Sequence, residues 1–359
     1  MSTFGIEEEF FIFDAETGMP AQPRHDPFQE LLAAQRAGQV QQELLACQIE
    51  YASTVCQDRT EALSELRNFR MALAYHAERE NLRVAGLGSA PMIPHQAPVL
   101  TDNQRYHEIG EFLSGITDEH YMCGLHIHVS IPDREAGVKA LNFLRPWLPL
   151  LCALAANSPY WHGTDSKFSS WRTIHYRKWS VQGIPPHFGD AADYESRLAR
   201  LASAEAVPDL GHIGWGIRLS ENYPTIELRV ADSQMRAHDS VLLAVLTRAL
   251  VDTAIESITP EEPFYPEMLD LALWQAAKNG VHANQLDPRN GATISTRDLA
   301  RRLLKLTEPA LRESKDYDFA VHSLRNLLET GNGAVRQRAA FARGSISHLL
   351  ENAHAEMQM

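Results

Sequence analysis

The sequence lacks the features that mark several large classes of protein. Its four cysteines are scattered and form no CxxC pair, which excludes a disulfide framework, a zinc finger and a thioredoxin-type redox site. We expect all four to be reduced core thiols. No apolar run reaches about 18 residues and no apolar leader is present, so we expect a cytoplasmic protein.

Phosphate-binding and nucleophile motifs are also missing. The chain contains no GxxxxGK[ST] loop, no GxGxxG turn and no GxSxG elbow. A nucleotide, if one binds, must therefore be held by arginines and by metal ions on carboxylates.

Basic residues are fewer than acidic ones. Among 359 residues, 33 Lys and Arg face 46 Asp and Glu, for a formal charge of −13. A net negative field repels phosphate backbones and anionic lipid, so we expect neither a nucleic-acid nor a membrane partner. No Pro/Gly/Ser-rich linker divides the chain. We expect one domain over 1–359, with a sheet-and-helix core over about 1–255 and a helical part over about 256–359.

Five segments alternate apolar and polar residues as half-buried strands do. They read GIEEEFFIF (5–13), ELLACQIEYAST (43–54), YMCGLHIHVSI (121–131), HIGWGIRLS (212–220) and TIELRVA (225–231). Helical patterns of varied length separate these strands, which favours an α+β fold with a mixed or antiparallel sheet over a regular βαβ array.

The predicted helices are bounded by recognisable residues. One runs from Thr60 to Leu82, and another from about Arg134 to Ala156 with a break expected at Pro146 and Pro149. Two more begin near His238 and Pro266, and the chain from about Ser295 onward reads as helical except near Gly331 and Gly333.

Each predicted strand has an apolar face and a polar face, because successive side chains point to opposite sides. In the first strand, Ile6, Phe10 and Ile12 oppose Glu7 and Glu9. A polar face that is merely solvated is usually rich in Lys, Thr and Ser, but these strands contain no Lys. We therefore interpret the polar face as functional. On the other four strands it carries Gln48, Glu50, His126, His128, His212, Arg218, Glu227 and Arg229.

The acidic residues on this face indicate the kind of metal. Carboxylates suit magnesium or manganese, whereas zinc prefers histidine and cysteine. The pair His126 and His128 alone would be a weak zinc signal, but no HExxH motif accompanies it. Mg²⁺ is therefore the expected ion, with Mn²⁺ as an alternative.

A long segment without a clear period runs from Asn157 to Asp190. Irregular segments of this length in compact domains are often binding loops. The segment is rich in aromatic and basic residues, of which Arg172 is the preferred candidate for a phosphate or carboxylate contact because a guanidinium binds such groups with two bonds. The alternative is a packed structural loop, which suits its tryptophans equally well.

Several motifs occur in a fixed order along the chain. They read GIEEEF, CGLHIHVSIPD, SPYWHGTDSKFSSWRT followed by GIPPHFG, and IELRVAD. Together they resemble the motifs of the carboxylate–amine ligases of the glutamate–cysteine ligase type 2 family over roughly residues 3 to 255. The resemblance implies a fold like the catalytic domain of glutamine synthetase, with a curved, largely antiparallel sheet, helices on its convex face and the active site on its concave face.

The resemblance also implies roles for individual residues. Arg172 and Arg229 would be catalytic and, together with His128, would bind the cofactor ATP. The metal ligands would be Glu7, Glu9, Glu50, His126 and Glu227. The expected substrates are small molecules, namely amino acids and ATP, and the expected assembly is a homodimer.

The family reaction activates the γ-carboxylate of glutamate with ATP and lets the amine of cysteine attack it. We expect this activity to be weak here. The long loop departs from the family pattern at Tyr176, Lys178, Ile184 and His187, which leaves the identity of the substrates open more than the reaction type. Tyr176 and His187 are the positions expected to select the amine. Two alternatives remain open at this point, a guanidino-kinase-like phosphotransferase and a non-catalytic metabolite sensor on the same fold.

Overall fold

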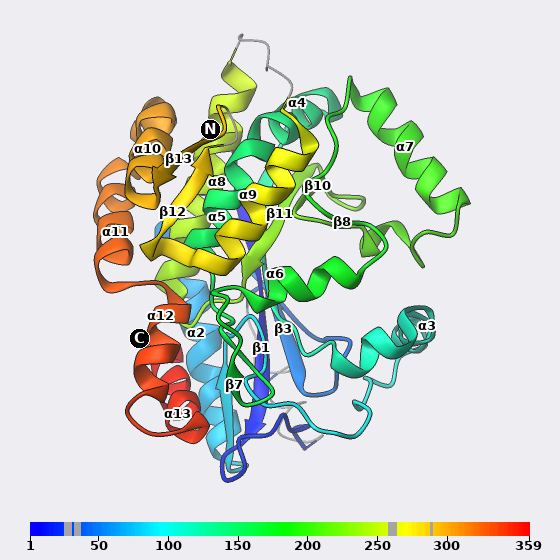
Figure 1. Cartoon of the computed structure of the whole chain (residues 1–359), viewed down its shortest axis with the longest axis vertical. Coiled ribbons are helices and arrows are strands. Elements are labelled where there is room, and N and C mark those ends of the chain that lie inside the picture. Colours follow the sequence, from blue (N-terminus) through cyan, green and yellow to red (C-terminus); the bar gives the residue numbers. More distant parts are fainter. Residues whose placement is uncertain (25–30, 32–36, 258–263, 288–289) are drawn as a thin grey trace.

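A single large sheet forms the centre of the computed structural model, which describes residues 1–24, 31, 37–257, 264–287 and 290–359. Its seven strands follow the order β10-β11-β5-β1-β3-β2, with β4 also paired to β1, and every pairing is antiparallel (Figure 1). The predicted α+β fold with a largely antiparallel sheet is confirmed. The strands are β1 Phe4–Asp14, β2 Gln39–Gln42, β3 Gln48–Ala52, β4 Leu82–Ala85, β5 Gly124–Ser130, β10 Ile217–Leu219 and β11 Thr225–Asp232.

Helices and three small strand pairs surround this sheet. The helices are α2 Arg59–Glu78, α3 Gln104–Leu113, α4 Arg134–Leu144, α5 Leu148–Ala155, α6 Trp171–His175, α7 Ala191–Ser203, α8 Ala237–Glu256, α9 Pro266–Asn279, α10 Thr296–Glu313, α11 Tyr317–Thr330, α12 Gly333–Phe341 and α13 Ile346–Met357. Short 3₁₀ helices are η1 Ser114–Glu119, η2 Arg145–Trp147, η3 Tyr176–Lys178, η4 Leu210–His212 and η5 Gly280–His282. The small pairs are β6 Tyr160–Trp161 with β7 Thr164–Asp165, β8 Gln182–Gly183 with β9 Gly214–Trp215, and β12 Asn284–Asp287 with β13 Ala292–Ser295.

Three predicted elements differ from the observed ones. Of the predicted strand 43–54, only Gln48–Ala52 forms a strand, and residues 43–47 form the turn that joins β2 to β3. The helix predicted to reach Leu82 ends at Glu78, because Asn81 adopts a left-handed conformation (φ 58°) and Leu82 begins β4. The predicted strand 212–220 is divided at Gly216 into β9 and β10, which belong to different sheets. The carbonyl of Gly216 accepts hydrogen bonds from the backbone of Arg229 and Val230 instead of continuing a regular ladder.

The predicted break inside the apolar segment 134–156 is confirmed, since η2 separates α4 from α5 at Pro146. By length and composition alone, the segment Arg134–Ala155 could cross a membrane, but 83% of its most apolar window is buried inside the protein. This burial is typical of a core helix in a globular protein.

The apolar face of the sheet packs against α2, α4, α5 and α8. The C-terminal helices α10 and α11 extend the same cluster with Leu303 and Leu324, and Figure 1 shows both beside α8. This shared core supports the prediction of one domain over 1–359, which stays a prediction. All four cysteines are buried and free, as expected. Cys47 and Cys123, however, lie in a second cluster with Phe11 and Phe13 and not in the main core.

The middle glutamate of the GIEEEF motif lies on the apolar face, where alternation predicts a hydrophobic residue. Glu8 is fully buried and forms an ion pair with Arg70 of α2, whose side chain is also fully buried. Nε of Arg70 donates to Oε2 of Glu8 at 2.9 Å, and the same guanidinium donates to the carbonyls of Gln234 and Met235 at 3.0 and 2.9 Å. One side chain thereby joins β1, α2 and the chain before α8.

Removing one charge of this pair should destabilise the protein strongly. Glu8→Gln leaves the Arg70 guanidinium buried without a counter-charge, so we expect a loss of about 3–5 kcal/mol in the free energy of unfolding. Denaturation by urea measures it. The matched control is Glu308→Gln, which breaks the exposed Arg312–Glu308 pair of α10 and should cost less than about 1 kcal/mol. The double variant Glu8→Leu/Arg70→Met should recover most of the loss, and a mild effect of Glu8→Gln alone would contradict this account.

Candidate active site

The register of the sheet brings together the polar residues that alternation predicted. Residues directly opposite one another on neighbouring antiparallel strands have side chains on the same face and in contact range. Four such cross-strand pairs run across five strands of the sheet, from β3 to β10. They are Glu50 with Glu9, Glu7 with His126, His128 with Glu227, and Glu227 with Arg218.

These residues line a cavity of about 690 Å³, a volume that suits small-molecule ligands. Three groups of its side chains place one ligand atom each within 4.8 Å of one another. Glu7 belongs to two of the groups, and so does Glu50, so the groups form a connected row. The groups are Glu7, His128 and Glu227; Glu7, Glu50 and His126; and Glu9, Glu43 and Glu50.

Oxygen-rich groups of this composition fit magnesium or manganese. The two imidazoles are oriented as metal ligands usually are, with one ring nitrogen fixed by a partner. Nδ1 of His126 lies 3.1 Å from Oε2 of Glu7, and Nδ1 of His128 lies 2.9 Å from Oγ1 of Thr225. Nε2 of His126 is buried and has no hydrogen-bond partner within the described ranges, and it lies 3.7 Å from Oε1 of Glu9. That nitrogen is available to a cation.

Sequence reasoning missed one member of this row. Glu43 opened the predicted strand 43–54, where alternation put it on the same face as Leu45 and Cys47. The structure places it instead in the loop after β2, where alternation does not apply. The structure places its carboxylate with those of Glu9 and Glu50.

Crowding divides the carboxylates of the row into two kinds. Burial, followed by the charge of Glu43, raises the pKa of Glu9 to about 8. Burial and the charges of Glu43 and Glu7 raise the pKa of Glu50 well above its ordinary value. Burial acts in the same direction on Glu227, but the guanidiniums of Arg229 and Arg218 hold its pKa well below the usual range. In the absence of a cation, Glu227 therefore stays ionised, whereas the crowded carboxylates of Glu9 and Glu50 bind protons more readily than ordinary glutamates.

The arginines that line the cavity are all engaged with carboxylates. Nε of Arg218 donates to Oε2 of Glu227 at 2.7 Å, and Arg229 also donates to Glu227. Arg105 of α3 also lines the cavity, and its Nε donates to Oδ2 of Asp209 at 3.2 Å. Two guanidiniums thus share Glu227, whose group also contains the carboxylate of Glu7.

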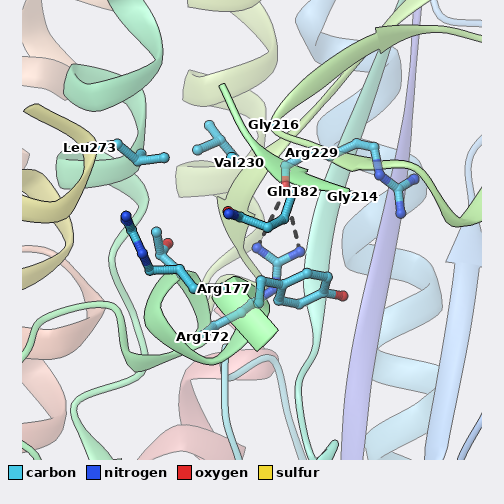
Figure 2. A pocket seen from close by; sticks show the side chains of 11 residues that line it. Arg172, Arg177, Gln182, Gly214, Gly216, Arg229, Val230 and Leu273 are labelled. Atoms are coloured by element: carbon cyan, nitrogen blue, oxygen red, sulfur yellow. Dashed lines mark hydrogen bonds between the residues drawn. The ribbon is translucent and has the colours of Figure 1, made fainter. Parts of the chain in front are cut away.

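Arg172 lies behind the cavity wall and is absent from the described residues that line the main cavity. Its side chain is only 4% exposed and packs against the ring of Tyr176, with its guanidinium carbon 4.6 Å from the ring centroid. Figure 2 shows Nη1 and Nη2 donating to the backbone carbonyl of Arg229, each at 3.3 Å, while the Arg229 side chain points away. The predicted contact of Arg172 with phosphate or carboxylate stays a prediction.

The Arg229 carbonyl needs such a donor because it lies in an irregular part of β11. The register between β11 and β5 shifts between Leu228 and Ala231, so the backbone there leaves the regular ladder. Gly124 makes room for the donor: a Cβ at this position would lie 2.5 Å from Nη2 of Arg172. The backbone N–H of Gly124 also donates to Oε2 of Glu9 at 2.7 Å, so this glycine contacts both parts of the site.

Asp232, the last residue of the IELRVAD motif, organises the long segment that follows Asn157. It is fully buried, and its carboxylate accepts from the Asn157 backbone and from the hydroxyls of Ser158 and Ser170 at 2.8, 2.7 and 2.9 Å. Nη1 of Arg172 lies 4.0 Å away. The motifs IELRVAD and SPYWHGTDSKFSSWRT are thus joined by buried hydrogen bonds.

The long segment predicted as an irregular loop forms a small hairpin, β6 and β7, and a short helix, α6. Tyr176 and Trp179 line the cavity, whereas Trp161 is part of the second apolar cluster. His187, expected to select the amine, is exposed and lies outside the described lining, so that expectation finds no support. The remaining basic residues of the segment have acidic partners: Lys167 with Asp165, Arg177 with Asp270 and Lys178 with Glu119.

Comparisons with a family profile, with related sequences and with solved structures agree with one another. A sequence profile described as glutamate-cysteine ligase family 2 matches residues 3–352. A Nocardia farcinica relative named "Putative glutamate--cysteine ligase 2-1" is 40% identical over 94% of this chain and 88% of its own, and a Mycolicibacterium vanbaalenii relative named "Putative glutamate--cysteine ligase 2-2" is 37% identical over 95% and 93%.

Two solved structures share the fold at low identity. A glutamate–cysteine ligase from Francisella tularensis, solved in complex with AMP, aligns with a TM-score of 0.74 at 10% identity and covers 99% of this chain and 88% of its own. A bifunctional glutathione synthetase from Pasteurella multocida aligns with a TM-score of 0.71 at 14% identity over 99% of this chain and 52% of its own.

The sheet, its row of carboxylates and these likenesses define an ATP-dependent carboxylate–amine ligase that acts on small molecules. The chain belongs to the glutamate–cysteine ligase family 2.

Cation binding to this site should be linked to proton release. Because the pKa of Glu9 is raised to about 8, this carboxylate is mostly protonated at pH 7 and must lose its proton to bind a cation. We therefore expect Mg²⁺ affinity to increase as the pH rises from 6.5 to 8.5. Calorimetry in two buffers of different ionisation enthalpy measures the released protons. Glu9→Gln should reduce the release, and an affinity that does not change with pH would contradict the assignment.

Proposed function

We propose that this ligase activates the γ-carboxylate of glutamate as an acyl phosphate and transfers the acyl group to an amine, with weak activity toward cysteine. The overall reaction would be L-glutamate, L-cysteine and ATP to γ-glutamylcysteine, ADP and phosphate. The observation that carries this proposal is the connected row of oxygen-rich groups inside one cavity, with guanidiniums at one end. Membership of the family supports it.

The row is proposed as the site of divalent cations, with Glu7, Glu9, Glu43, Glu50, His126, His128 and Glu227 as ligands. Bound Mg²⁺, or Mn²⁺ in its place, would neutralise the triphosphate and stabilise the transferring phosphoryl group. His128 was expected to bind the nucleotide, and its place beside Glu7 and Glu227 favours a metal ligand instead.

Arg229 and Arg218 are the groups proposed to face the phosphates. Both already lie in the cavity, and because they share Glu227 they carry more charge than that carboxylate cancels. A guanidinium fixed in a site that excludes water stabilises charge that develops on an acyl phosphate. Arg172 would act through Arg229 as a positioning residue, since its two donors hold the Arg229 carbonyl.

We infer the orientation of the nucleotide from the residues at the two ends of the row. Glu7 and His128 also line a second, apolar recess of about 530 Å³ along the first residues of β1 and the last of β5, where Tyr223 lies edge-on to His128. An apolar recess beside charged phosphate-binding groups suits a base and its sugar. We place the nucleoside there and the carboxylate and amine at the Glu9 end.

A trapping experiment tests the reaction type. Hydroxylamine is a small nucleophile that converts an acyl phosphate to a hydroxamate without needing a fitted amine site. With ATP, Mg²⁺, glutamate and hydroxylamine, we expect hydroxamate and ADP in equal amounts. A phosphotransferase would instead release ADP without hydroxamate, and a sensor would release neither.

Two carboxylates of the row should be essential for turnover. Glu50→Gln and Glu227→Gln each remove a proposed metal ligand, and we expect hydroxamate formation to fall by at least 10³-fold, about 4 kcal/mol in activation free energy. Glu227→Gln also removes the counter-charge of Arg218 and Arg229, so circular dichroism is used to compare both variants at a temperature at which they are folded. Glu221→Gln is the control, because Glu221 lines the same cavity but belongs to none of the three groups. Near-normal turnover in either variant would remove that residue from the metal site.

The positioning role of Arg172 has a specific signature. Arg172→Lys keeps the charge but loses the two donors on the Arg229 carbonyl, so we expect kcat to fall at least tenfold with little change in KM for ATP. Arg177→Lys is the matched control. Arg177 and Arg172 line one small recess (Figure 2), but Arg177 forms an ion pair with Asp270. A large rise in the KM for ATP or glutamate in Arg172→Lys would indicate direct substrate contact instead.

A further inference from the structure

The Glu9 end of the cavity has a wall made of aromatic and apolar side chains. The residues that line it come from three separate parts of the chain and are Tyr106, Ile109, His120, Met122, Tyr176 and Trp179. Burial and the charges of Glu43 and Glu50 raise the pKa of Tyr106. Burial also raises the pKa of Tyr176, against the charge of Arg172 and together with that of Glu9. This set, called here the aromatic wall, is therefore beside the carboxylates of the third metal group.

The rings of the aromatic wall pack against one another. Trp179 stacks on Tyr176 with ring centroids 5.0 Å apart, and its ring also lies nearly parallel to that of His212 at 6.1 Å. His120 packs against Tyr176 and Trp179 at 5.5 and 5.3 Å. The indole therefore already has two stacked partners within the protein. Aromatic rings together with Met122 and Ile109 suit a compact apolar or sulfur-bearing group.

Two buried polar atoms of the wall, Nδ1 of His120 and Nε1 of Trp179, have no hydrogen-bond partner among the residues described. The side chain of His120 is only 6% exposed. Burial, followed by the charge of His175, holds the pKa of His120 well below its usual range, so the ring is neutral. A neutral imidazole gives this end of the cavity a polar contact without adding positive charge.

The same end offers nothing that suits a second carboxylate. In the described part of the chain no lysine lines the cavity, and the wall adjoins the carboxylates of Glu9, Glu43 and Glu50. Of the guanidiniums near the wall, Arg172 lies behind Tyr176 and is absent from the described lining, and Arg105 is engaged by Asp209, which also accepts from Nδ1 of His212 at 2.9 Å. A carboxylate placed there would adjoin the acidic side chains of the third metal group, and the described lining offers no unengaged cationic side chain to pair with it.

We propose that the acceptor of this ligase is a primary amine with a compact apolar or thiol-bearing body and no carboxylate, and that the aromatic wall binds that body. This inference rests on the proposed function. Amide formation balances as follows: the amine nitrogen forms a bond to the acyl carbon, the bond from that carbon to the phosphate oxygen breaks, phosphate leaves with the electron pair, and the amine loses a proton. A mismatch of the carboxylate of cysteine explains why activity toward cysteine would be weak.

Matched pairs of amines test the acceptor class. L-Cysteine and cysteamine, L-leucine and 3-methylbutylamine, and L-phenylalanine and phenethylamine differ only by the carboxylate. With ATP, Mg²⁺ and glutamate, we expect kcat/KM for ADP release to be at least tenfold higher for the decarboxylated member of at least one pair. Higher values for the amino acid in every active pair would overturn the inference.

Two variants connect the preference to the named residues. Trp179→Ala removes a large part of the wall and should lower kcat/KM for the preferred amine more than that for hydroxylamine, with the affinity for ATP unchanged. Asp209→Asn releases Arg105 to pair with a substrate carboxylate, so the ratio of amine to amino acid should fall at least fivefold. Asp209 is half exposed, and this substitution should leave folding intact. Loss of ATP affinity in Trp179→Ala would show that the wall binds the nucleoside and would overturn the inference.

Hydroxylamine separates failure of this inference from failure of the proposed function. If hydroxamate forms but none of the amines without a carboxylate is used, the acceptor class is wrong and the ligase reaction stands. If glutamate and hydroxylamine also yield no hydroxamate, the proposed function fails, and the inference fails with it.

Discussion

The site depends on the buried ion pair between Glu8 and Arg70. Glu7 and Glu9 can point into the cavity only because the residue between them points the opposite way, and that residue is also a glutamate. A buried carboxylate needs a partner of opposite charge, and Arg70 supplies it while also binding two carbonyls before α8. The strand that carries two predicted metal ligands is thus tied to the helices beneath it by charge as well as by apolar packing. A shift of β1 by one residue in its register would turn Glu7 and Glu9 toward the core and Glu8 toward the cavity.

Alternation along strands was sufficient to predict most of the polar face. Glu7, Glu9, Glu50, His126 and Glu227 were all assigned to one side of a sheet from period two alone, and their cross-strand register places them in one row. The same rule could not identify Glu43, which lies in a loop, or recognise Glu8 as a structural residue, because one sequence does not distinguish two uses of the same side chain. Arg172 was selected for its chemistry, but its surroundings arise from tertiary contacts with β11 and Tyr176 that no local pattern encodes.

The motifs that resemble the family contain structural residues as well as ligands. Asp232 of IELRVAD binds Ser158 and Ser170 of the long segment, and Arg172 from that segment binds the carbonyl of Arg229. Each motif therefore completes the hydrogen bonding of another, because buried polar groups must be satisfied. Gly124 fits the same scheme, since it leaves space for Arg172 and donates to Glu9. The order of motifs along the chain consequently reports a network of contacts in addition to a list of catalytic groups.

The sharing of ligands within the row has an electrostatic consequence. Glu7 and Glu50 each belong to two groups, so a cation bound at one group changes the charge experienced at the next. Glu227 stays ionised through its arginines and Glu7 through its histidines, and these residues prepare one end of the row for a cation. At the other end, crowding raises the pKa of Glu9 and of Glu50. On the proposed assignment, a first cation bound through Glu7 would lower the repulsion among these carboxylates and so favour a second. The groups that share Glu7 and Glu50 would then fill in order, from Glu227 toward the aromatic wall.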